Sequence, residues 1–157
     1  MSRLSEELGF VPLIESDDYG GAGIDSDGVT LAKAHTLSAI FVFGAITGNS
    51  ILIVYEGATA AKTTAIAFSY RLGAADYKVA LADQLGDATA VASTGLTLTA
   101  ATFDHKMLVV EIDSDTLTAG YPFVTFEIDA TANPMNVGAV GVIKSRYPGH
   151  LIPTVLA

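Results

Sequence analysis

From residue 35 onward, apolar side chains recur at every second position in short segments that end at turn residues. Most of them are β-branched or aromatic, and a period of two places them on one face of an extended strand. In residues 106–113, for example, Leu108, Val110 and Ile112 alternate with Glu111. The pattern predicts about eight or nine strands, over residues 37–45, 50–56, 64–72, 74–86, 87–92, 96–100, 106–113, 121–129 and 136–144.

The turns between these segments predict how some of them connect. Residues 47–49 and 93–95 are rich in Thr, Ser, Gly and Asn, so each is expected to join its two flanking strands into a hairpin. Residues 74–86 fit a strand or a short helix about equally well, and we expect a short strand there. In residues 121–129 we expect Thr125 to face water together with Glu127.

One segment is apolar on both of its faces. Ala39, Phe41 and Phe43 alternate with Ile40 and Val42, so both faces of this strand are expected to be covered. Residues 136–144 similarly set Val137, Ala139 and Ile143 against Val140 and Val142.

Together these patterns predict an all-β protein. A length of 157 residues suits one domain, and strands without intervening helices favour a single antiparallel β-sandwich or jelly-roll-like domain. We expect this domain to span residues 36–157, with an irregular C-terminal tail that contains Pro148 and Pro153. Residues 1–35 are expected to form an extended, irregular N-terminal arm.

Charge and apolar run length exclude several classes of function. The net charge of -9 disfavours binding to nucleic acid. The acidic first residues do not resemble a signal peptide, and the most apolar run, residues 37–46, is shorter than the roughly 20 residues that cross a membrane. We therefore expect a protein made in the cytoplasm, with no membrane and no nucleic acid among its partners.

No group of residues forms recognisable catalytic machinery, so we expect no enzyme, no cofactor and no metal site. Asp25 and Asp27 precede Gly28 as in a calcium loop, but the position of the bidentate acid is Thr36. A turn is the favoured interpretation there, and a weak cation site that also involves Asp17 and Asp18 stays open. The three histidines lie far apart, and no Gly-x-Ser-x-Gly motif is present.

The surface is expected to be poor in charge. Only 16% of the residues are charged, whereas the chain has 16 Thr and 24 Ala. Threonine suits strands and supplies polarity without charge. Such a surface can lie closely against another protein, which suggests that partners cover much of it, although an ordinary low-charge domain is the simpler alternative.

The order of several short segments resembles that of the head decoration proteins, or capsid cement proteins, of tailed bacteriophages. The segments that carry the resemblance are YGGAGIDSDGV (19–29), FGAITG (43–48), VYEGA (54–58), FSYRL (68–72), MLVVEID (107–113) and RYP (146–148).

This resemblance implies a β-rich virion structural protein on the outer surface of the capsid. Such proteins assemble as homotrimers or networks, bind several subunits of the major capsid protein and use an N-terminal arm to reach a neighbour. Because aromatic and large apolar residues dominate interfaces, the candidate capsid or oligomer contacts are Leu8, Phe10, Val11, Leu13, Tyr19 and Tyr147.

Two other functions stay open from the sequence. A phage tail or tube component would have a similar composition and would form rings or stacks by itself. A carbohydrate-binding jelly roll is the weaker alternative, because the chain has no Trp to stack on a sugar.

Overall fold

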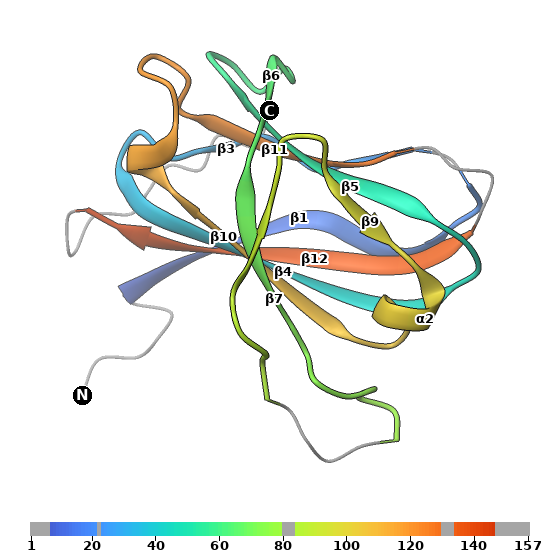
Figure 1. The fold of residues 1–157 in the computed structure, drawn as a ribbon. Helices are drawn as coiled ribbons and strands as arrows, with labels where there is room; N and C mark the ends of the chain where they lie inside the picture. The colour runs from blue at the N-terminus through green and yellow to red at the C-terminus, as the bar shows by residue number, and fades with distance from the viewer. Residues whose placement is uncertain (1–6, 22, 80–83, 130–133, 147–157) are drawn as a thin grey trace.

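The protein is a sandwich of two antiparallel sheets (Figure 1), so the predicted all-β sandwich is confirmed. The structure is a computed structural model that describes residues 7–21, 23–79, 84–129 and 134–146. The first sheet has the order β1-β12-β4-β10-β7-β8. Its strands are β1 (Leu8–Tyr19), β4 (Ala34–Ile46), β7 (Phe68–Leu72), β8 (Thr89–Val91), β10 (Met107–Asp113) and β12 (Met135–Ser145).

The second sheet has the order β2-β11-β5-β6, with β3 beside β11 and β9 beside β5. Its strands are β2 (Ile24–Asp25), β3 (Val29–Thr30), β5 (Ser50–Gly57), β6 (Thr64–Ile66), β9 (Leu96–Leu98) and β11 (Phe123–Ile128). The short helix α2 (Ala100–Phe103) and the 3-10 turn η1 (Ser114–Thr116) lie between strands.

The core lies between the two sheets and is built from the predicted inward faces. Phe41 and Phe43 of β4 are fully buried, and the ring of Phe41 meets the edge of Phe126 of β11 with 5.5 Å between ring centroids. Leu108, Val110 and Ile112 are buried from β10 as the alternation predicts. Edge-to-face ring packing of this kind adds to the burial of apolar area that holds the sheets together.

Both predicted hairpins are wrong. The turn at residues 47–49 leads from β4 in the first sheet to β5 in the second, and residues 93–95 lead from β8 in the first sheet to β9 in the second. Gly95 has φ +93° and lies against β5, where an added Cβ would come within 2.6 Å of a methyl of Ile51. The turn residues were correctly located, but they connect the two layers.

The segment 64–72 also divides between the sheets. β6 pairs with β5 in the second sheet, and after Ala67 the chain continues as β7, which pairs with β10 in the first. A strand that bends and changes sheet makes a corner of a sandwich. The short strand expected over residues 74–86 is wrong for the part that the structure describes, where Gly73 and Leu85 form a single β-bridge.

The irregular N-terminal arm is wrong for residues 8–19, which form β1. This strand pairs with β12 from Leu8 opposite Lys144 to Tyr19 opposite Met135, and Val11, Leu13 and Ile14 enter the core. Register shifts on both sides of Ile14 interrupt the alternation, which explains why the sequence pattern did not show a strand. Residues 24–25 and 29–30 add β2 and β3 to the second sheet.

Adjacent residues of β1 test this correction. Val11 is buried and Phe10 is 49% exposed, so Val11→Asp should abolish or strongly weaken cooperative unfolding in urea, because an unpaired buried charge costs several kcal/mol. Phe10→Asp should change the unfolding free energy by less than about 1 kcal/mol. Equal urea midpoints for the two variants, followed by circular dichroism, would mean that this segment is not packed on the domain.

Candidate functional site: the outer face of the first sheet

The outer face of the second sheet is covered by the chain itself. Thr125 points outward from β11, but it is only 5% exposed because its Oγ1 donates a hydrogen bond to the carbonyl of Ala60 at 3.2 Å. The expectation that Thr125 faces water is therefore wrong. Lys62 of the same loop forms ion pairs with Asp25 at 2.8 Å and with Glu127 at 3.0 Å.

Charged and aromatic groups hold this loop in place. The hydrogen bond to Asp25 raises the pKa of Lys62, and the ammonium lies 5.7 Å from the ring centroid of Tyr55. Burial, followed by a hydrogen bond to Glu127, raises the pKa of Tyr55. These contacts are made within the chain and cover part of the outer face of the second sheet. This face is therefore not the favoured place for a partner to bind.

The outer face of the first sheet is different because apolar side chains lie side by side across its strands. Pro12 is opposite Val140, Val140 is opposite Ile40, and Ile40 is opposite Val109, which makes one apolar row over four neighbouring strands. The next rows add Phe10 opposite Val142 and Val42 opposite Met107. We call the exposed or half-buried part of this surface the outer apolar face: Phe10, Pro12, Ile40, Val42, Val140 and Val142.

Exposure shows that the described part of the chain leaves this face without a cover. Val42 is 45% exposed and Val140 is 44% exposed, although both belong to central strands of the sheet. The expectation that both faces of residues 37–45 are covered is therefore wrong for Val42. A contiguous exposed apolar patch on a domain is typical of an interaction surface.

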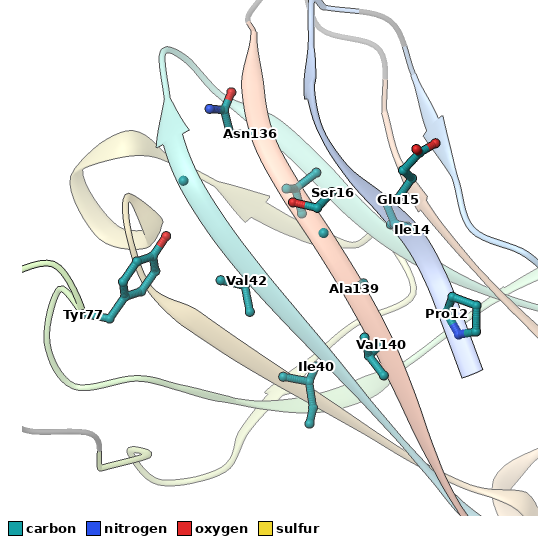
Figure 2. Close-up of a pocket in the computed structure, with 13 residues that line it drawn as sticks. Pro12, Ile14, Glu15, Ser16, Ile40, Val42, Tyr77, Asn136, Ala139 and Val140 are labelled. Atoms are coloured by element: carbon teal, nitrogen blue, oxygen red, sulfur yellow. The ribbon is translucent and has the colours of Figure 1, made fainter. Parts of the chain in front are cut away.

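A groove of about 560 Å³ runs along this face. Figure 2 shows Tyr77 on one side of Val42 and Val140, and Pro12 and Glu15 of β1 on the other. The hydroxyl of Tyr77 donates to the carbonyl of Phe43 at 2.7 Å, which fixes that wall. The other residues that line the groove are Ile14, Ser16, Ile40, Gly44, Asn136, Val137, Gly138 and Ala139.

Acidic residues lie on the β1 side of the groove, where Glu15 lines it and Asp17 and Asp18 lie beyond it on the same strand. Glu15, Asp17 and Asp18 are exposed on β1, and none of them forms an ion pair within the described part of the chain. Burial, followed by the charges of Glu15 and Asp17, raises the pKa of Tyr19, whose hydroxyl donates to the carbonyl of Glu15 at 2.9 Å. The carboxylates of Glu15 and Asp17 therefore contribute to the electrostatic environment of Tyr19.

The opposite wall carries charges of both signs. Nε2 of His105 lies 3.3 Å from the ammonium of Lys78 and 3.7 Å from a carboxylate oxygen of Asp104. The other oxygen of Asp104 accepts a hydrogen bond from the backbone N–H of Ile46 at 2.8 Å. Burial, followed by the charges of Asp76 and Asp104, raises the pKa of Tyr77.

The turn beside this wall holds His105 close to Asp104 and Lys78. His105 occupies a turn with φ 52°, and its Nδ1 has no hydrogen-bond partner within the residues that the structure describes. Over the same residues, no three His, Asp or Glu side chains gather as a metal site would require. Of the acids considered for a cation, Asp25 is engaged by Lys62.

The predicted contact residues have different environments. Phe10 is exposed on the outer apolar face, whereas Val11 and Leu13 are buried in the core of this chain and cannot contact a partner while β1 stays in place. Leu8 is half-buried on β1, and Tyr19 packs against the core. Tyr147 lies outside the described residues.

The sequence analysis missed the central part of this face, on β4 and β12. Ile40, Val42, Val140 and Val142 were recognised as the second faces of their strands, but they were not proposed as contacts. The sequence feature that could have identified them as contacts is the presence of apolar side chains on both faces of a strand. In an antiparallel fold one face is usually polar.

Comparisons with known proteins add little to this description. The sequence matches no known protein family and no curated protein. Among solved structures, the SPBc2 prophage-derived protein YomS is similar over 86% of this chain and 92% of its own, with 12% identity and a TM-score of 0.44. The infectious bursal disease virus Gt strain structure is similar over 94% of this chain and 45% of its own, with 13% identity and a TM-score of 0.25. Similarity at this level carries no argument about function.

Among the described residues, no helix is long and apolar enough to cross a membrane.

The exposure of the outer apolar face can be measured with a dye that binds exposed hydrophobic surface. We expect a Val42→Thr/Val140→Thr double variant to lower the dye fluorescence of the folded protein while changing the unfolding free energy by no more than about 1 kcal/mol. The matched control is Val79→Thr, because Val79 is 82% exposed but does not line the groove. An equal fall in fluorescence for the control would contradict a localised binding face.

Proposed function

We propose that this chain is a virion structural protein that decorates and stabilises the outer surface of a tailed-phage capsid. The observation that carries this proposal is the outer apolar face, which the described residues leave uncovered while a loop of the chain covers part of the second sheet. The sequence resemblance to head decoration proteins supports the kind of partner, the major capsid protein.

The physics of such a role fits the groove and the surface around it. A decoration protein adds stability by burying area, and apolar area removed from water contributes about 25 cal/mol per Å². Half-exposed valines on a rigid sheet can be buried without first ordering a loop, so less binding energy is lost to conformational entropy. Repetition over a symmetric shell then multiplies a modest contact.

The oligomer and the location are part of the same proposal. We infer a homotrimer that binds several major capsid subunits, assembled after synthesis in the host cytoplasm. A net charge of -9 suits the outside of the shell, away from packaged DNA. The protein has a structural role in this proposal and performs no reaction.

Co-sedimentation with expanded capsids tests this function. The capsids are assembled from the major capsid protein encoded in the same genome. Wild-type protein should sediment with them, and Val42→Asp and Val140→Asp should each reduce the bound fraction at least about tenfold, because a buried unpaired carboxylate is costly. Val79→Asp is the control and should bind like the wild type.

Two results would contradict this proposal. One is failure of the wild-type protein to sediment with expanded capsids, and the other is equal binding by all the variants. Rings or stacks of the purified protein in electron micrographs would instead support the alternative of a tail or tube component.

A further inference from the structure

We infer that the groove on the outer apolar face takes an apolar segment of a different protein, with Lys or Arg residues on the side of that segment that meets β1. The inference uses the binding site of the proposed function, and it specifies the chemistry of the occupant. It does not require that the occupant belong to a capsid.

The centre of the groove requires an apolar occupant. Ile40, Val42 and Val140 present their side chains there (Figure 2). Gly44 and Gly138 also line the groove and have no side chain. Gly138 is also needed for the approach of β1, because an added Cβ would come within 2.9 Å of the Cβ of Ser16. A charged group placed over these residues would lose water without gaining a partner.

The acidic residues of β1 favour an occupant with Lys or Arg on the side that lies against this strand. Glu15 lines the groove, and Asp17 and Asp18 follow it on the same exposed edge without ion pairs in the described structure. Near Tyr77 on the opposite side, Lys78 partly offsets the negative charges of Asp76 and Asp104. The electrostatic potential is therefore more negative on the β1 side of the groove, and a basic group of the occupant is favoured there.

The shape of the groove argues against the same groove of a second copy as the occupant. A two-fold interface needs a patch that is complementary to itself. Here the face is hollowed into a groove of about 560 Å³, with Tyr77 and Pro12 on either side of Val42 and Val140, so two facing grooves would place one hollow against another.

The C-terminal segment of the chain lacks the required charge. Residues 147–157 contain apolar side chains but no Lys or Arg. A separate protein with a basic flank therefore satisfies both the apolar and the acidic parts of the site.

Designed peptides test the inference without a known partner. The probe is a fluorescein-labelled ten-residue peptide with four valines, separated by serine and threonine, and two lysines at one end. The matched probe has two glutamates in place of the lysines. Fluorescence anisotropy at low salt should give a Kd about tenfold lower for the lysine probe, because screened surface charges each contribute a small factor.

Three variants locate the effect. Glu15→Gln/Asp17→Asn/Asp18→Asn should bring the ratio of the two Kd values close to one. Asp27→Asn/Asp87→Asn/Asp113→Asn changes the net charge equally at exposed positions that do not line the groove, and it should keep the tenfold preference. Val42→Asp should remove binding of both probes.

The inference is overturned if the two probes bind equally to the wild type, or if the groove variant and its control behave alike. It is also overturned if sedimentation velocity shows a dimer that Val42→Asp dissociates, since a second copy would then occupy the face. Peptide discrimination without capsid binding would contradict the capsid proposal alone, and capsid binding without discrimination would contradict this inference alone.

Discussion

The contact between Phe41 and Phe126 determines much of the rest of the structure, because it joins the two sheets at β4, a central strand of the first sheet. β4 is flanked by β12 and β10, so its register is fixed on both sides. A strand that turns Phe41 and Phe43 into the core must turn Ile40 and Val42 outward, and a shift of one residue would reverse both faces. The exposed apolar face is thus a direct consequence of how the core is built.

The strands and their inward faces were predictable from the sequence, whereas their neighbours were not. Alternation correctly identified the buried residues of β10, such as Val110 and Ile112. It could not show that the turn at residues 47–49 changes sheets, because local turn chemistry is the same in a hairpin and in a crossing. What decides the connection is the pairing of β4 with β12 and of β5 with β11, far along the chain.

The binding face was only partly predictable for a related reason. β5 also has apolar residues on its second face, but the turn at Gly95 lies against Ile51 and Ile53 and half-buries them. Val42 has a similar pattern in sequence, and no described residue covers it in this way. Sequence periodicity shows that a second face is apolar, and only the path of distant loops shows whether the chain covers that face itself.

In the proposed function, binding to the capsid covers the outer face of the first sheet. The chain has no cysteine, so a single thiol can be placed at will. Val42→Cys and Val79→Cys should react with a maleimide at similar rates in the free protein, because both positions are exposed. When the protein is bound to capsids, we expect strong protection of the Val42→Cys variant and continued labelling of the Val79→Cys variant. Equal labelling of both variants in the bound state would contradict the proposed function.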